Sequence, residues 1–232
     1  MKIVIFGDIH GNRYAFDCFL DEIKKIDSEY IFFTGDIMGY YYNQSYIVRK
    51  LASIDKLISV LGNHDKMYLD ANNNEDDLIK LSNKYGRSYI LCSKDTFISE
   101  YLRKQKEKVD ITIVNRRIIL VHGSIDNFIN GRIYPDKVGE LSEIINVDYV
   151  LFGHTHYRMN EKIGNTRWVN PGSLGQPRDG KEPSYCIIDL ENDTVEYKTI
   201  FYNKKLLLEE IRNNDPDNIY LKEVLFRRDS DE

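Results

Sequence analysis

The chain has 232 residues, enough to bury a substantial core in one large domain or two small ones. Its formal net charge of -5 argues against a nucleic-acid polymer as partner, because such polymers bind to basic faces. The apolar start, residues 1–6, is too short for a signal-peptide core and no later run could span a bilayer, so no membrane partner is expected.

The first half of the chain alternates between predicted strands and helices. Short apolar runs predict strands over residues 2–6, 30–33 and 57–61. Apolar residues at helical spacing follow Asn12, a suitable N-cap, and a second helix is predicted over 44–53. This order implies parallel pairing with right-handed crossovers, and such sheets place their sites beyond the carboxyl ends of the strands. The polar segment 72–77 is expected to be a loop or helix start, and 95–106 a helix.

Strands dominate the second half. They are predicted over 111–114, 117–121, 149–152, 167–169, 184–190 and 194–201, with hairpins around 115–116 and 191–193 and a helix over 135–145. From Lys204 the chain is charged and helical, with Leu206, Leu207 and Ile211 on its inward face. The expected fold class is α/β, an αββα sandwich of two sheets packed face to face with helices outside. We expect a single domain over 1–232, with a helical C-terminal extension from about residue 203.

The three cysteines are widely spaced and form no CxxC pattern. They predict free, mostly buried thiols in a reducing cytoplasm, and none is expected to bind metal. A cytoplasmic location follows from this expectation. The residues concerned are Cys18, Cys92 and Cys186.

All five histidines stand in short segments that are predicted strand ends. A fold that brings strand ends together would gather every imidazole around one point. The segments are Asp8-Ile9-His10, Gly62-Asn63-His64-Asp65, Val121-His122-Gly123 and Gly153-His154-Thr155-His156.

Together with Asp36, these residues suffice to bind two divalent transition-metal ions. Asp8 and His10 are two apart, so on an extended segment they would point to the same side, and His154 and His156 repeat this spacing. The carboxylate of Asp36 could bridge two ions. The mixed oxygen and nitrogen set suits Mn, Fe, Zn, Ni or Co better than Ca, and manganese is favoured.

The ordered series DxH, GD, GNHD, HG and GHTH resembles the calcineurin-like metallophosphoesterase superfamily, from Lys2 to about Tyr202. Residues 35–40 and 170–180 resemble its compact prokaryotic phosphodiesterase branch, which has no large cap domain. The resemblance implies that His64 is not a ligand but faces the scissile phosphate, where it stabilises developing charge or protonates the leaving oxygen. Asp65 would steady this loop. The implied ligands are Asp8, His10, Asp36 and His156 for the first metal, and Asp36, Asn63, His122 and His154 for the second.

The function implied is a binuclear metal-dependent phosphoesterase, preferably a phosphodiesterase, that hydrolyses a small phosphodiester or nucleotide by attack of a metal-bound hydroxide. Two cations keep the pocket positive inside an acidic protein, so the expected partner is a small anionic phosphate ester. One alternative is a phosphomonoesterase or protein phosphatase, although the chain lacks long insertions that would build a peptide groove. Another is a non-catalytic scaffold on the same fold, which predicts loss of the histidine in GNHD, whereas His64 is present.

Three further features have two readings each. Arg178 could bind a phosphate oxygen bidentately, or lie on the surface bonded to Asp179. Asn12 could contact phosphate, although capping its helix is the simpler role. The tyrosines at 40–42 replace the Gly-Pro that relatives often show after the first tyrosine; they could stack on a nucleobase or be ordinary rim aromatics.

Overall fold

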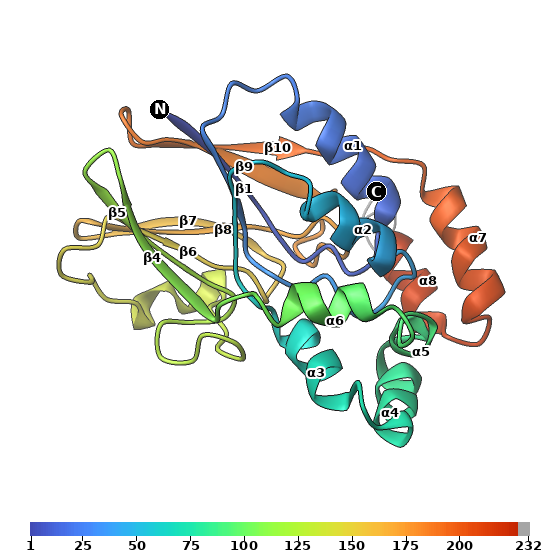
Figure 1. Cartoon of the computed structure of the whole chain (residues 1–232). Coiled ribbons are helices and arrows are strands. Elements are labelled where there is room, and N and C mark those ends of the chain that lie inside the picture. Colours follow the sequence, from blue (N-terminus) through green and yellow to red (C-terminus); the bar gives the residue numbers. More distant parts are fainter. Residues whose placement is uncertain (227–232) are drawn as a thin grey trace.

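The structure, a computed structural model, describes residues 1–226 of the chain. Residues 227–232, the end of the single domain predicted over 1–232, lie outside the described residues. Two five-stranded sheets form the centre of the molecule. Figure 1 shows the two sheets one above the other, with helices gathered outside the first sheet. The predicted two-sheet α/β sandwich is therefore confirmed.

The first sheet joins strands from both ends of the chain. β1 (Lys2–Phe6), β2 (Tyr30–Phe33) and β3 (Leu57–Ser59) are parallel. β9 (Ser184–Asp189) pairs antiparallel with β1, and β10 (Thr194–Thr199) pairs antiparallel with β9. The order is β10-β9-β1-β2-β3. The predicted parallel start and the hairpin around 191–193 are both confirmed.

The second sheet has the order β4-β5-β6-β8-β7. The hairpin predicted around residues 115–116 is the antiparallel pair β4–β5. β7 was not predicted, because residues 160–162 in its middle are polar and exposed and the strand lacks an apolar run. The strands are β4 (Lys108–Ile113), β5 (Arg116–Val121), β6 (Tyr149–Leu151), β7 (Arg158–Ile163) and β8 (Thr166–Pro171).

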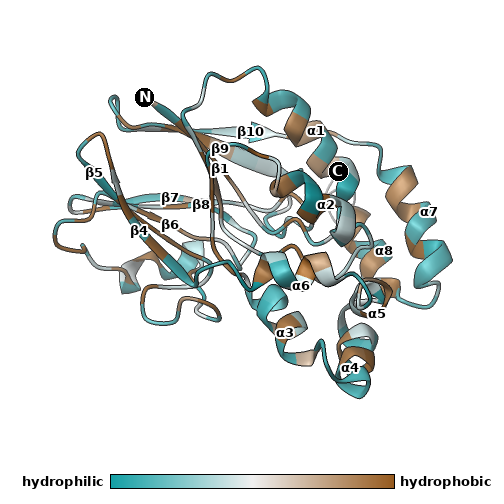
Figure 2. Ribbon diagram, in the orientation of Figure 1, coloured by the Kyte–Doolittle hydropathy of each residue, from teal (hydrophilic) through white to brown (hydrophobic). Residues whose placement is uncertain are grey.

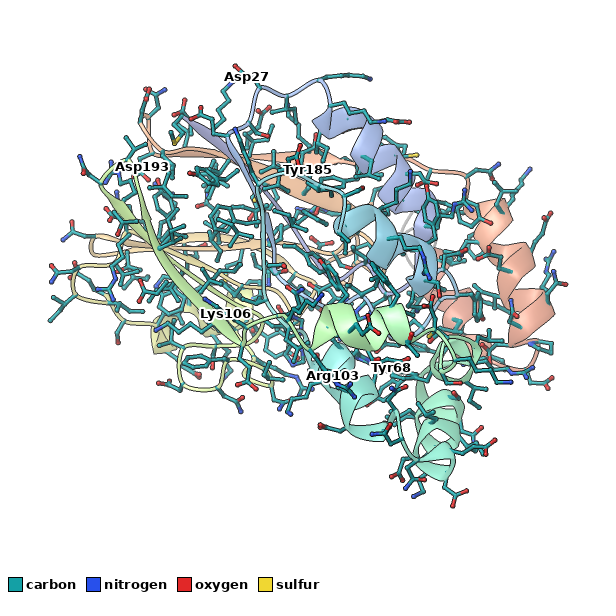
Figure 3. All side chains as sticks on the ribbon, in the orientation of Figure 1. Asp27, Tyr68, Arg103, Lys106, Tyr185 and Asp193 are labelled. Atoms are coloured by element: carbon teal, nitrogen blue, oxygen red, sulfur yellow. The ribbon has the colours of Figure 1, made fainter. Side chains whose placement is uncertain are left out.

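Alternation along the strands builds the layers. In β1, Ile3 and Ile5 pack between the sheets, while Val4 and Phe6 face helices α1 (Arg13–Ile23) and α2 (Gln44–Leu51). Fully burying one such side chain contributes about 1.5–3 kcal/mol. Side chains fill the layer between the first sheet and its helices, where Tyr185 of β9 meets Phe19 of α1 with ring centroids 5.1 Å apart (Figure 3).

The helical elements in the middle of the chain, from β3 to β6, differ from the prediction. The helix expected over 135–145 is wrong: only a 3-10 turn, η1 (Pro135–Glu140), forms there. The backbone leaves helical geometry at Lys137, and no residue of the turn is fully buried to stabilise a longer helix. Three helices were not predicted as such. They are α3 (Asn63–Ala71), α4 (Glu75–Tyr85), which begins inside the polar segment 72–77, and α5 (Ser88–Leu91). The helix predicted over 95–106 is the shorter α6 (Thr96–Leu102).

Two helices end the described chain, α7 (Lys204–Asn214) and α8 (Ile219–Phe226). Leu207 and Ile211 are buried as predicted, but Leu206 is 42% exposed, so its expected inward position is wrong. A period of 3.6 residues cannot turn the adjacent positions 206 and 207 equally inward. Figure 2 shows brown and teal turns alternating along α7, as in an amphipathic helix.

No helix within residues 1–226 is long and apolar enough to cross a bilayer. The three cysteines are free thiols as predicted, with Cys92 and Cys186 buried and Cys18 partly buried.

Candidate metal centre

The backbone at the centre is left-handed rather than extended. The prediction that Asp8 and His10, and likewise His154 and His156, converge from extended segments is therefore wrong. All four residues, and Asp36, have φ between 48° and 67°. Each left-handed non-glycine residue costs about 1–3 kcal/mol and persists only where the surroundings enforce it. Hydrogen bonds between loops do so here: Asp8 N donates to Gly35 O at 2.9 Å and Ile9 N to Asp36 O at 2.9 Å.

The first group of converging side chains is Asp8, His10 and His156, all buried. Their ligand atoms lie within 4.8 Å of one another. His156 Nε2 is 3.3 Å from Asp8 Oδ1 and 3.1 Å from His10 Nε2. These residues follow β1 and β6, which belong to different sheets.

The second group is Asp36, His122 and His154, with Asn63 beside it. His122 Nε2 lies 2.9 Å from Asn63 Oδ1 and 3.4 Å from Asp36 Oδ2. The same Asp36 oxygen lies 3.7 Å from His10 Nε2 of the first group. Asp36 is therefore placed between the two groups, and every sequence-predicted ligand lies in one cluster.

Three of these histidines are held in one tautomer. The Nδ1–H of His10 donates to Met38 O at 2.8 Å, that of His122 to Thr34 O at 2.8 Å and that of His156 to a backbone carbonyl, Gln176 O, at 2.6 Å. In the neutral rings each Nε2 then carries a lone pair that points inward. The lone pairs of His10 and His156 face each other with no proton between them, an arrangement that a cation stabilises.

Three ligand atoms of this cluster are buried without a hydrogen-bond partner. Among the described residues, Asp8 Oδ2, Asp36 Oδ2 and His154 Nε2 are buried and make no hydrogen bond. A buried acceptor left without a partner costs about 1–3 kcal/mol. Oxygen and imidazole nitrogen donors of this kind fit divalent transition-metal ions.

Burial and charge oppose each other in this cluster. Burial raises the pKa of Asp8 to about 6 and lowers the pKa values of His10 and His154 to about 3. Burial would raise the pKa of Asp36 as well, but the imidazoles of His122 and His64 outweigh it and hold that pKa well below its usual range. Burial would likewise lower the pKa of His122, but Asp36 raises it to about 9.

Asp65 holds the loops around the centre. The segment 63–65 is the first turn of α3 rather than a strand end, and Asp65 is its third residue. Its carboxylate accepts backbone N–H bonds from two separate loops, which confirms the predicted steadying role. The donors are Gly62 N, Asp36 N, Ile37 N and Met38 N, at 2.8–3.1 Å.

His64 stands beside the ligands, 7% exposed. Its backbone N donates to Asp36 Oδ1 at 2.8 Å, and its Nδ1 is 2.7 Å from the hydroxyl of Tyr89 in α5. Burial lowers the pKa of His64 to about 4. Gly39 permits this packing, because a Cβ there would lie 2.7 Å from His64 Nδ1 and its φ is +86°. Sequence reasoning missed Tyr89, since a tyrosine in a short helix carries no motif.

Arg178 lies at the centre rather than in a surface pair with Asp179. Its Nη2 is 3.4 Å from both Tyr40 Oη and Gln176 Oε1. Asp179 instead accepts from Arg158 Nε at 2.7 Å. The guanidinium lowers the pKa of His156, in addition to the larger effect of burial.

Asn12 and the tyrosines at 40–42 also have defined places. Asn12 is fully buried; its Oδ1 accepts from Ala15 N at 3.1 Å and its Nδ2 donates to Gly175 O at 3.3 Å, so its amide caps α1 and ties two loops. Tyr40 is 5% exposed and Tyr41 is fully buried, so neither is an ordinary rim residue. The Tyr40 ring lies 4.8 Å from that of His10.

The model of the calcineurin-like phosphoesterase superfamily domain matches residues 1–193. The chain belongs to this superfamily. It is 31% identical over 246 residues to the uncharacterized protein MJ0912 of Methanocaldococcus jannaschii, covering 97% of each chain. It is 22% identical over 223 residues to the phosphodiesterase YfcE of Escherichia coli, covering 92% of this chain and 99% of the relative. The hypothetical protein PH1004 of Pyrococcus horikoshii has the same fold, with a TM-score of 0.84 at 21% identity over 96% of this chain and 97% of that one.

This calcineurin-like phosphoesterase is therefore a metal-dependent hydrolase by family, and its two His/Asp groups supply donors for divalent ions. The family match ends at residue 193, so α7 and α8 lie beyond it.

Proposed function

We propose that this phosphoesterase binds two divalent ions side by side and hydrolyses a small phosphodiester or nucleotide. The observation that carries the proposal is the position of Asp36 Oδ2, a buried atom without a hydrogen bond that lies near histidine nitrogens of both groups. A carboxylate oxygen in that place can bridge two cations. Manganese is the favoured ion, because the set holds hard oxygen and imidazole donors and no thiolate.

The proposed ligands are those of the two groups. Bound there, the ions would act as Lewis acids on the phosphate oxygens and make a nucleophile available from water near neutral pH. The protein holds the donors in place beforehand, because the carbonyls of Met38, Thr34 and Gln176 fix three imidazoles. Asp8, His10, Asp36 and His156 would hold the first ion, and Asp36, Asn63, His122 and His154 would hold the second.

His64 is the proposed catalytic residue, and it acts as a neutral donor. The Tyr89 hydroxyl is fully buried, and His64 Nδ1 is the one acceptor for its proton among the described residues. If the hydroxyl donates to Nδ1, the His64 proton is on Nε2, opposite to the tautomer of the three ligand histidines. That Nε2–H can stabilise charge on the leaving oxygen through a hydrogen bond. A protonated imidazole, the form expected from the resemblance for proton transfer, is scarce at neutral pH when the pKa is about 4.

Arg178 is the proposed phosphate contact, because its guanidinium lies beside Tyr40 and its charge acts on the ligand His156. Asn12 is not retained for this role, since both ends of its amide are already bonded within the protein. The preference for diesters over monoesters is supported by the relative named a phosphodiesterase. The free thiols support a reducing cytoplasm as the location.

The test is a metal reconstitution assay. Purified protein is stripped of metal and Mn²⁺, Ni²⁺, Zn²⁺ or Mg²⁺ is returned, with bis-p-nitrophenyl phosphate assayed beside p-nitrophenyl phosphate. We expect metal-dependent cleavage that favours the diester and collapses in His64→Ala. The control is Asp110→Asn, which should leave the rate unchanged because Asp110 of β4 forms an exposed ion pair with Arg117 of β5. Failure to bind two ions per chain would refute the binuclear centre, and a faster monoester rate would refute the diester preference.

A further inference from the structure

Three tyrosines from distant parts of the chain form a series of ring contacts that reaches His64. The ring of Tyr85, at the end of α4, lies 4.7 Å from that of His64, and the ring of Tyr40 lies 5.1 Å from it. Tyr220 of α8 lies 6.2 Å from Tyr40. We call Tyr40, Tyr85 and Tyr220 the tyrosine cluster. Tyr40 is nearly buried, whereas Tyr220 is 40% exposed and Tyr85 is partly exposed, so the cluster presents aromatic surface to solvent.

The C-terminal helices hold Tyr220 in place. Asp215, which ends α7, accepts from the hydroxyl of Tyr42 at 2.8 Å and from Arg87 N at 2.9 Å. Glu210 accepts from the Tyr14 hydroxyl at 2.9 Å. An apolar contact completes the attachment, formed by Leu207, Ile211, Leu221 and Leu225 against Tyr40 and Tyr41. Figure 1 shows α7 and α8 at the right of the molecule, near α1 and α5.

A cation and an amide connect the tyrosine cluster to the metal ligands. The Tyr220 hydroxyl donates to Gln176 Oε1 at 3.3 Å, and Arg178 Nη2 lies 3.4 Å from the same oxygen and from Tyr40 Oη. The backbone carbonyl of Gln176 accepts from His156 Nδ1. The order from the exposed aromatic surface inward is thus Tyr220, Gln176 and Arg178, then the first group of ligands.

We propose that the tyrosine cluster and Arg178 form the subsite for the leaving group, and that this leaving group is a nucleoside. The inference rests on the proposed function, because the leaving group is defined as the part that departs beside His64. Aromatic faces gain stacking energy from a planar base and little from an aliphatic alcohol. A guanidinium beside them binds the phosphate that the base is attached to. Tyr220 belongs to α8, beyond the residues that the family model matches, so the residue that determines specificity comes from the C-terminal helices.

The experiment measures inhibition of p-nitrophenyl ester hydrolysis by the metal-loaded full-length enzyme with two probes. Adenosine occupies only a leaving-group subsite, whereas inorganic phosphate occupies only the metal centre. The variants are Tyr220→Ala, Tyr220→Phe and the control Ile219→Ala, which removes the 64% exposed neighbour on the same helix. We expect the inhibition constant of adenosine to rise about tenfold in Tyr220→Ala, the typical loss of one base–aromatic stack, and to change little in the other two variants. The constant for phosphate should stay the same in all three.

The outcomes separate the two proposals. A wild-type enzyme that hydrolyses the ester and is inhibited by phosphate but not by adenosine overturns the subsite and keeps the proposed function. Equal inhibition by adenosine in wild type and Tyr220→Ala also overturns it. A wild-type protein that shows no metal-dependent hydrolysis refutes the proposed function itself.

Discussion

Two acidic residues, Asp36 and Asp193, show how this protein treats a buried or half-buried carboxylate in opposite ways. Asp193 lies in the turn between β9 and β10, labelled in Figure 3, and both its oxygens are bonded by cations or a hydroxyl. Arg167 Nε and Nη2 donate to it at 3.0 Å, and Lys162 Nζ and the Tyr149 hydroxyl at 2.7 Å. These bonds, above all those from Arg167, hold the pKa of Asp193 well below its usual range.

Asp36 is more deeply buried and less completely bonded. Its Oδ1 accepts one backbone N–H, from His64, while its Oδ2 is buried without a hydrogen bond and faces imidazole nitrogens. A satisfied carboxylate contributes to stability, whereas a buried oxygen without a hydrogen bond has a cost that a bound cation offsets. Comparing the two residues indicates that a buried carboxylate oxygen without a hydrogen bond, and not burial of the charge by itself, marks a binding site.

Substituting Asp36 should produce the largest effect. In Asp36→Asn the proposed bridge is lost, and the rate of diester hydrolysis at saturating Mn²⁺ should fall by at least about a hundredfold, since a metal supplies several kcal/mol of charge stabilisation. The melting temperature of the metal-free protein should change little, because His122 can release the proton that Asp36 holds on it, so no buried charge is left unpaired. Steady-state kinetics and calorimetry check the two parts. A metal-free variant that is clearly less stable would place Asp36 in the same class as Asp193.

Metal affinity should depend strongly on pH. Bound ligands must be deprotonated, and in the metal-free protein Asp8, with a pKa of about 6, and His122, with a pKa of about 9, hold protons below those values. Affinity should therefore fall as the pH is lowered, by about tenfold per unit where one proton is released. Calorimetric titration with Zn²⁺ in buffers of different ionisation enthalpy measures the protons released. An affinity that is constant from pH 8 to pH 6 would contradict the assignment of these residues as ligands.

Tyr89→Phe should give a smaller loss. Removing one hydrogen bond worth about 1 kcal/mol is expected to lower kcat about fivefold with little change in KM. The decisive readout is ¹⁵N NMR of histidine-labelled, Zn²⁺-loaded protein. In wild type His64 should carry its proton on Nε2 and His10, His122 and His156 on Nδ1; in the variant the preference of His64 should weaken. A wild-type His64 protonated on Nδ1 would refute the role given to Tyr89.

The smallest effect belongs to the satisfied carboxylate. Asp193→Asn should leave the diester rate unchanged and lower the free energy of unfolding by about 1 kcal/mol, a discounted value because the side chain is partly exposed. A carboxylate whose pKa is lower in the folded state than in the unfolded state stabilises the fold above the unfolded-state pKa, which is about 4. The difference in unfolding free energy between wild type and variant should therefore shrink as the pH falls below that value. Urea denaturation at pH 7 and pH 3 tests this, and an equal difference at both would contradict it.

Much of the centre could be predicted from the residues alone. The DxH, GNHD and GHTH segments placed each donor at the end of an apolar run, and the parallel order of β1, β2 and β3 followed from alternating strand and helix patterns. Both are local properties, since periodicity within a few residues defines an element and its end. The exceptions were also local: the polar strand β7 and the short turn at 135–140 lack the apolar pattern that such predictions use.

The family, the order of the elements and the set of donors could all be predicted from short segments of the chain. The tertiary structure decided how those donors are held: the left-handed backbone at Asp8 and His10, the histidine tautomers, and the partnership of His64 with Tyr89. It also decided that Tyr220, 156 positions after His64, lies in the same aromatic cluster. These features arise from contacts between elements far apart in the chain, and no periodicity or motif within one segment records which distant side chain will meet it.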